Sequence, residues 1–184
     1  MTRALKDGFW SHKAMKKRVL IVEDDAAVRD SMKKVLEAAG FGVEAAADGQ
    51  EAVVGFVPEE VDLVLLDLNL PFLSGWDVFE RLTTKYPLVP IIIITGRPRQ
   101  FPTALAAGVG ALIEKPNEVP MLLKTIDQVL AEPPEARLRR MCGYEENTRY
   151  APAPTERTGG QRSHHATKAH AQLQSSSAAR APRK

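Results

Sequence analysis

A run of apolar residues that ends in a single carboxylate constrains the fold of this chain more than any other feature. Residues 63–66 (LVLL) are all large and apolar, and Asp67 follows them directly. An uninterrupted apolar run of this kind is typical of a strand that is buried on both faces of a parallel sheet. Because an isolated carboxylate is costly to remove from water, its position at the end of such a strand indicates a functional site.

Apolar residues are concentrated in one part of the chain. The 184 residues are 44% hydrophobic, but after residue 150 the only large aliphatic or aromatic residue is Leu173. A segment with so little apolar surface cannot offset the entropy that it would lose on ordering. We therefore predict one domain at residues 17–131. A basic extension at residues 1–16 and a basic tail rich in Pro, Ser and Ala at residues 132–184 are both predicted to be disordered.

The domain alternates predicted strands with predicted helices. The strands are expected at residues 19–22, 43–46, 63–66, 90–95 and 111–114, and the helices at residues 28–39, 52–56, 76–85, 103–108 and 118–130. Such alternation with short connections favours a parallel sheet with helices on both faces. Five units in about 110 residues fit a flavodoxin-like, doubly wound α/β fold with five strands in the order 2-1-3-4-5.

Polar residues gather where the predicted strands end. Glu23 and Asp24 follow the first strand, Asp67 the third, Thr95 ends the fourth, and Lys115 follows the fifth. Carboxylates in one crevice repel each other unless a cation joins them, and oxygen ligands without His or Cys favour Mg²⁺. A lysine and a hydroxyl beside such a metal can hold a phosphoryl group. The pattern predicts that the central Asp is a nucleophile that becomes an aspartyl-phosphate.

Over residues 17–131 the chain resembles the receiver domain of bacterial two-component response regulators. The resemblance lies in the order and spacing of five short motifs, which are VLIVEDD at 19–25, LLDLNLP at 65–71, SG at 74–75, ITG at 94–96 and EKP at 114–116. It implies that Asp67 is the phosphoacceptor. It also implies that Asp24, Asp67 and the backbone carbonyl of Asn69 hold Mg²⁺, while Glu23 completes the acidic pair indirectly.

The resemblance assigns the switch and phosphate-binding roles as well. Thr95 matches the switch hydroxyl, Gly96 the small residue that leaves room for the phosphoryl group, and Lys115 the lysine that contacts it. The bond between Lys115 and Pro116 is expected to be cis. At the position where the family usually has a switching aromatic residue, this chain has Leu112, so the aromatic part of the switch is not the usual one.

The implied function is a stand-alone response regulator, since no helix-turn-helix pattern follows the receiver. A sensor histidine kinase or a phosphotransfer protein would donate the phosphoryl group. The signal would then pass to a protein partner through the surface of the fourth helix, fifth strand and fifth helix, which also allows a homodimer. The prolines between Thr95 and Lys115 predict a short or irregular fourth helix.

A different class of protein also uses an Asp nucleophile with a Thr, a Lys and Mg²⁺, namely phosphatases of the haloacid dehalogenase kind. In that class the nucleophile comes first, as Asp-x-Asp, and the acidic metal pair comes late. Here the acidic pair at Glu23 and Asp24 precedes Asp67, and this order favours the receiver. We therefore expect self-phosphorylation and auto-dephosphorylation only, and no other enzyme activity.

The charge distribution and the composition restrict the classes of partner and the compartment that fit this chain. Residues 19–130 carry nine Lys or Arg against seventeen Asp or Glu, whereas both ends of the chain are basic. The acidic body argues against nucleic acid, although binding through the basic tail stays open as an alternative. One cysteine, Cys142, excludes an intramolecular disulfide, and no apolar run approaches the ~20 residues of a membrane span. These features predict a cytoplasmic protein.

Two residues near the predicted site have two interpretations each. Asp25 is either a third carboxylate of the metal site or the N-cap of the first helix, where Asp is favoured. Arg97 lies two residues after Thr95, where it either controls water access to the acyl phosphate or extends into solvent.

Overall fold

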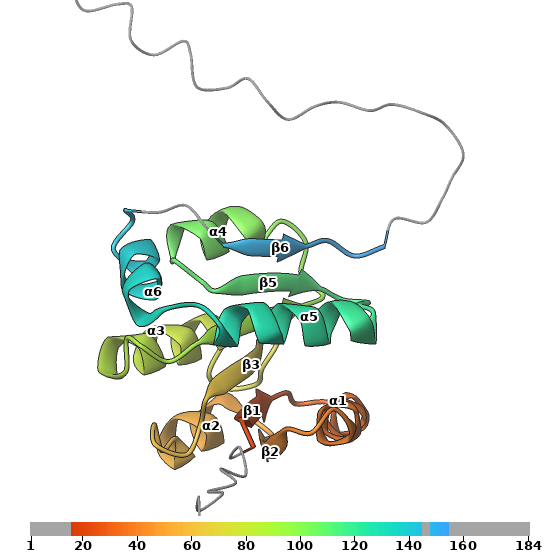
Figure 1. Ribbon diagram of the computed structural model, residues 1–184. Helices are drawn as coiled ribbons and strands as arrows, with labels where there is room; N and C mark the ends of the chain where they lie inside the picture. The colour runs from red at the N-terminus through yellow and green to blue at the C-terminus, as the bar shows by residue number, and fades with distance from the viewer. Residues whose placement is uncertain (1–15, 145–147, 155–184) are drawn as a thin grey trace, which may run out of the picture. The chain divides into compact units, whose positions relative to one another are not determined.

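The structure, a computed structural model, describes residues 16–144 and 148–154. Its strands form one parallel sheet in the order β2-β1-β3-β4-β5-β6 (Figure 1). They are β1 Arg18–Val22, β2 Gly42–Ala46, β3 Leu63–Asp67, β4 Ile91–Thr95, β5 Ala111–Glu114 and β6 Arg149–Ala151. The helices are α1 Ala26–Ala38, α2 Gly49–Gly55, α3 Gly75–Lys85, α4 Phe101–Ala106, α5 Val119–Leu130 and α6 Pro134–Met141. The predicted doubly wound order 2-1-3-4-5 is confirmed.

Helices cover both faces of this sheet, as predicted. On one face, residues of α2, α3 and α4 such as Ala52, Val78 and Ala104 pack against the strands. On the other face, α1 and α5 contribute Leu36 and Ile126 among others. Every residue of β3 and β4 is buried as a result. The two central strands are therefore rigid supports for the residues at their carboxyl ends.

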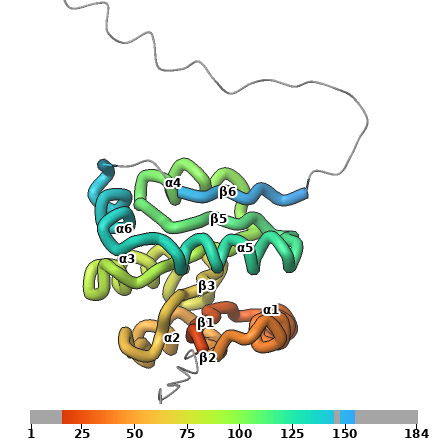
Figure 2. Tube along the Cα trace, viewed as in Figure 1, coloured from red at the N-terminus to blue at the C-terminus, as the bar shows by residue number. Residues whose placement is uncertain are grey.

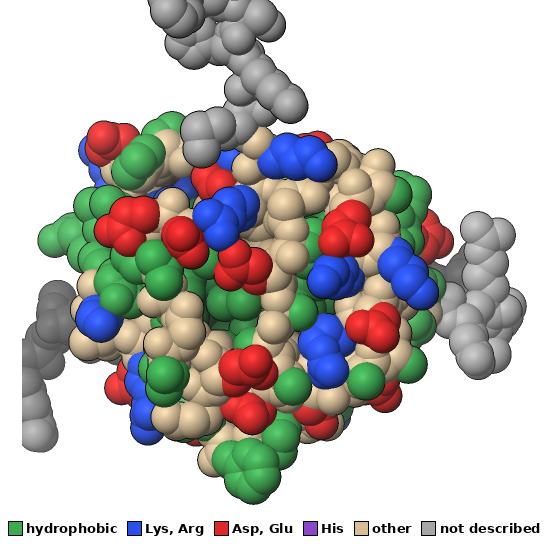
Figure 3. Space-filling model, turned by 90° about the horizontal axis from the view of Figure 1, so that it is seen from below, with side chains coloured by type: hydrophobic (Ala, Val, Ile, Leu, Met, Phe, Trp, Pro, Cys, Tyr) green, Lys and Arg blue, Asp and Glu red, His purple; other side chains and the backbone are tan. Residues whose placement is uncertain are grey.

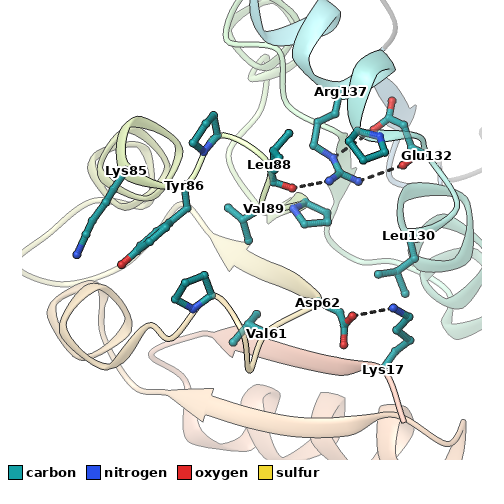
Figure 4. A pocket seen from close by; sticks show the side chains of 14 residues that line it. Lys17, Val61, Asp62, Lys85, Tyr86, Leu88, Val89, Leu130, Glu132 and Arg137 are labelled. Carbon is teal, nitrogen blue, oxygen red and sulfur yellow. Dashed lines mark hydrogen bonds and ion pairs between the residues drawn. The ribbon is translucent and has the colours of Figure 1, made fainter. Parts of the chain in front are cut away.

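The tail predicted at residues 132–184 begins too early, because α6 packs on the domain through two buried arginines. The guanidinium of Arg137 donates to the backbone carbonyl of Leu88 and lies beside Glu132 (Figure 4). The guanidinium of Arg140 pairs with the same glutamate, and its Nε donates to the carbonyl of Gly108 at 3.0 Å. The prediction counted only apolar residues, whereas backbone carbonyls and Glu132 partly compensate these buried charges.

A sixth strand also lies in the predicted tail, so the prediction of five strands is short by one. In β6, Tyr150 pairs in parallel register with Leu112 of β5, and Figure 2 shows the two segments side by side. The edge of β5 is thereby covered by the chain's own backbone. The predictions of disorder for residues 1–15 and 155–184 lie outside the described residues.

The fourth helix is short, as expected, but it begins earlier than predicted. It comprises Phe101–Ala106 rather than residues 103–108, because Pro102 lies in its first turn, where a proline needs no hydrogen-bond partner for its nitrogen. Across residues 16–144 and 148–154, no helix has the length and apolar character that crossing a bilayer requires.

We predict that Gly75→Ala destabilises the domain. A Cβ at this position, the first of α3, would lie 2.2 Å from the carbonyl oxygen of Asp67 and 2.6 Å from the Cα of Leu68. Relieving such contacts in a packed region costs about 1–3 kcal/mol, measurable as a lower urea midpoint. Gly55→Ala in α2 is the matched control, since nothing lies within 4 Å of its added Cβ. Equal stability of the two variants would contradict the prediction.

Candidate functional site

The ends of β1 and β3 bring the three predicted carboxylates together. Val22 and Leu66 are paired in register, so Glu23 and Asp24 emerge beside Asp67. One ligand oxygen from each of these residues lies within 4.8 Å of the others. The acidic pair and the predicted phosphoacceptor therefore form one group, as the sequence predicted.

Lys115 connects two of these carboxylates. Its Nζ lies 2.7 Å from Glu23 Oε2 and 3.0 Å from Asp67 Oδ2. The side chains of Glu23 and Asp67 are only 3% and 5% exposed, whereas Asp24 is exposed. Three carboxylates and one ammonium leave an excess of negative charge at this edge of the sheet.

Burial and the ion pairs act in opposite directions on the protonation of these groups. Burial raises the pKa of Glu23 above its usual value, and Lys115 offsets only part of that increase. Burial alone would lower the pKa of Lys115, but its hydrogen bonds to Glu23 and Asp67 outweigh this, and the pKa is raised. Lys115 therefore stays charged, while the Glu23 carboxylate lacks full compensation.

One oxygen of Asp67 lacks a partner. Oδ1 is buried and accepts no hydrogen bond from residues 16–144 or 148–154, although Oδ2 is held by Lys115. A buried acceptor without a donor is uncommon in folded proteins and indicates a group that binds there. Oxygen ligands alone, with an excess of negative charge, fit a hard divalent cation such as Mg²⁺. The residues present thus fit the predicted metal.

The side chain of Asn69 makes a contact that the prediction did not include. Its side-chain Oδ1 accepts a hydrogen bond of 3.0 Å from Arg97 Nε. Arg97 therefore bridges the loop after β3 to the loop after β4, which neither of its two interpretations had included. The role of the Asn69 backbone carbonyl as a metal ligand stays a prediction.

Thr95 and Gly96 lie at the end of β4, the strand next to the one that carries Asp67. Thr95 is fully buried at the end of β4, and its Oγ1 accepts a hydrogen bond of 3.0 Å from Arg97 N. The hydroxyl proton is thus available for donation. A Cβ at Gly96 would meet nothing within 4 Å, so the space beside it is open. The Lys115–Pro116 bond is cis, as the resemblance implied.

The structure also decides between interpretations of neighbouring residues. Asp25 caps α1, because its Oδ1 accepts from the backbone nitrogens of Ala27 and Val28. Leu112 is completely buried in the core on the α4 side of the sheet. In this structure the Leu112 side chain is a packed core residue.

Two residues near the site were missed. Phe72, in the loop between β3 and α3, is 97% exposed and has a φ of 62°. Glu114, which precedes Lys115, accepts from Tyr150 Oη and from Ala153 N at 2.8 Å and 3.2 Å. Its pairing could not be found while residues 149–154 were assigned to a disordered tail.

Two hollows of the surface lie at opposite ends of the sheet. A cavity of about 580 Å³ lies where the strands begin, lined by residues such as Lys17, Val61 and Leu88 (Figure 4). A groove of about 470 Å³ lies between α1 and the start of α5, and Lys115 forms part of its wall. Of these two hollows, the groove is the one that includes Lys115, which contacts Glu23 and Asp67.

Comparison with known proteins identifies one family. Residues 19–127 match the family model described as the response regulator receiver domain. Curated relatives include the response regulator MprA of Mycolicibacterium vanbaalenii, 34% identical over 115 residues, which are 61% of this chain and 50% of that protein. The alkaline phosphatase synthesis transcriptional regulatory protein PhoP of Bacillus subtilis is 33% identical over 53% of this chain and 40% of that protein. The chain spans about half the length of these relatives or less.

Solved structures agree with the fold. A receiver domain protein from Methanospirillum hungatei has a TM-score of 0.59 and 36% identity, covering 62% of this chain and 94% of the other. The chemotaxis response regulator CheY4 of Vibrio cholerae has a TM-score of 0.57 and 29% identity, covering 62% and 98%.

We predict that Asp24→Asn weakens Mg²⁺ binding by about tenfold or more, because it removes an exposed carboxylate of the triad. Isothermal titration calorimetry measures this directly. Asp25→Asn removes the same charge one residue away and keeps a good N-cap, so its affinity should remain close to that of the wild type. Equal weakening by both variants would indicate a diffuse charge effect instead of a ligand.

Proposed function

Since this chain belongs to the response regulator receiver family, we propose that Asp67 accepts a phosphoryl group from the phosphohistidine of a sensor histidine kinase or a phosphotransfer protein. The observation that carries this proposal is the state of the Asp67 carboxylate. It is buried, one oxygen is fixed by Lys115 at 3.0 Å, and the other lacks a partner. A carboxylate so held is oriented and only partly compensated, as a nucleophile requires.

The transfer exchanges one bond for another. An oxygen of Asp67 attacks the phosphorus, an O–P bond forms, and the N–P bond to the donor imidazole breaks. The electron pair stays on the imidazole nitrogen, which takes up a proton from water. Lys115 can pair with a phosphoryl oxygen, and the free hydroxyl proton of Thr95 can be donated to another. Attack by water on the acyl phosphate later releases inorganic phosphate and restores the carboxylate.

Magnesium belongs to this proposal. Asp24 and Asp67 would hold the ion together with the Asn69 carbonyl, and Glu23 would contribute indirectly. When bound, it would neutralise the excess carboxylate charge and the charge of the phosphoryl oxygens. The described residues supply the orientation, through the buried strand ends and Lys115.

The groove between α1 and α5 is the surface that we assign to the phosphodonor. It is lined by apolar side chains, among them Val28, Met32, Pro116 and Val119, and its wall includes Lys115. A partner helix seated in this groove places its phosphohistidine beside the carboxylates. The position next to the site, and not the size of the groove, supports this assignment.

The output is proposed to be a protein–protein contact in the cytoplasm, where a phosphohistidine donor meets this domain. The charge pattern supports a protein partner over nucleic acid, because residues 19–130 carry nine Lys or Arg against seventeen Asp or Glu. Figure 3 shows charges of both signs interspersed on the face seen from below. Two arginines of the predicted basic tail, Arg137 and Arg140, are buried. Action as a stand-alone regulator, without enzymatic turnover of other substrates, stays a prediction.

Incubation with acetyl phosphate and Mg²⁺ should add one phosphoryl group per chain, read as intact mass. Asp67→Asn should abolish the addition, because the amide is not a nucleophile. Asp62→Asn should retain it, since Asp62 pairs with Lys17 at the opposite end of the strands.

The same preparation distinguishes a receiver from the phosphatase alternative. A receiver should not turn over p-nitrophenyl phosphate repeatedly, since its proposed donors are a phosphohistidine or an acyl phosphate and not a phosphomonoester. Repeated turnover of this monoester that depends on Asp67 would refute the receiver function and support the phosphatase.

A further inference from the structure

Besides the main-chain pairing with β5 and the ion pair of Arg149 with Glu132, the short strand β6 is attached to the domain by two side-chain contacts of Tyr150. The Tyr150 ring stacks on Phe101, the first residue of α4, with centroids 4.5 Å apart. Its hydroxyl donates to Glu114 Oε1 at 2.8 Å. Glu114 Oε2 also accepts from Ala153 N, two residues beyond the strand. Figure 1 shows β6 lying along β5 and beside α4.

The hydrogen bond between the Tyr150 hydroxyl and Glu114 leads directly to the candidate site. Glu114 immediately precedes Lys115, whose Nζ contacts Glu23 and Asp67. Glu114 is also paired in register with Thr95, and Lys115 N donates to the Thr95 carbonyl at 2.8 Å. A change in the position of Lys115 or Thr95 therefore acts on the residue that binds the Tyr150 hydroxyl.

The stacking of Tyr150 on Phe101 leads to the same site by another route. The Oγ1 of Thr95 accepts from Arg97 N, and the Arg97 side chain is bound to Asn69 in the loop after Asp67. Only residues 96–100 separate Thr95 from Phe101. A rearrangement of this short loop moves the start of α4 and with it the ring that supports Tyr150.

The strand itself is weakly held compared with the strands inside the sheet. It comprises three residues, and Tyr150 is 42% exposed, whereas every residue of β4 is buried. Short, exposed segments with few buried apolar contacts open at the low end of the range of local stabilities.

We propose that residues 149–154 are a displaceable strand whose docking is coupled to the state of Asp67. This inference rests on the proposed function. A phosphoryl group would draw Lys115 Nζ and the Thr95 hydroxyl toward its oxygens. This movement would disturb the contacts of Tyr150 with Glu114 and with Phe101. The strand is docked in the unphosphorylated protein and is released on phosphorylation. Release exposes the main-chain edge of β5 and the Phe101 ring, which together fit an extended segment of a protein partner.

Hydrogen–deuterium exchange of the full chain, with and without Mg²⁺ and beryllofluoride as the phosphoryl mimic, tests the coupling. Amide exchange in residues 148–154 should increase about fivefold or more on modification, within the usual range of allosteric coupling. Tyr150→Phe removes the hydrogen bond to Glu114, and Tyr150→Ala removes both this bond and the stacking on Phe101. Amide exchange in the unmodified protein should therefore rise in that order. Tyr144→Phe is the matched control, because Tyr144 is 82% exposed, and its exchange pattern should equal that of the wild type.

Linkage supplies a second measurement. If docking and modification oppose each other, Tyr150→Ala should tighten beryllofluoride binding by the factor by which the mimic increases exchange. Beryllofluoride binding without any change of exchange in residues 148–154 would overturn the inference and leave the proposed function intact. Failure of Asp67 to bind beryllofluoride or to be phosphorylated by acetyl phosphate would overturn both.

Discussion

Lys115 lies between Glu23 and Asp67, and the electrostatic balance of the site depends on these two ion pairs. Both carboxylates are nearly removed from water, and Asp24 adds a third negative charge within 4.8 Å. One ammonium cannot compensate three carboxylates, so either a proton or a second cation must join them. Burial raises the pKa of Glu23, and Oδ1 of Asp67, which has no partner among the described residues, is the place for a cation. The site is thus incomplete by itself, which is what a site for a metal and a phosphoryl group requires.

The sheet prevents the carboxylates from moving apart to relieve their repulsion. The strand that carries Asp67 is buried along its whole length, and Leu68 beyond it is fully buried as well. Only the connections after the strands are free to respond to a new charge. The connection after β4 is short, since five residues join Thr95 to α4, and Arg97 ties it to Asn69. The proposed coupling therefore runs from Asp67 toward α4 and the neighbouring edge of β5.

The sequence predicted the site better than the limits of the domain, for a physical reason. Long apolar runs such as residues 63–66 and 91–94 define buried strands, and strand ends in a parallel sheet meet at one edge, so Glu23, Asp67 and Lys115 could be placed together. Residues 132–154 give no such signal. Their burial depends on Arg137 and Arg140, whose guanidinium groups bind backbone carbonyls and Glu132. Composition treats these arginines as solvated, and only the folded chain reveals their acceptors. A three-residue strand likewise has no periodicity to detect.

The sixth strand alters what the resemblance implied about the output surface. An unpaired edge of β5 would be open to another chain, and a homodimer through α4, β5 and α5 was one of the options. Here the chain itself pairs with that edge, from Ala111 to Ile113. A partner that needs the edge must compete with β6, and its apparent affinity is reduced by the fraction of molecules in which β6 is docked. The buried Leu112 cannot report the state of Thr95 by changing its exposure. Tyr150, the aromatic residue in register with Leu112, is 42% exposed and contacts Glu114 and Phe101. It therefore lies at the end of both routes from the site.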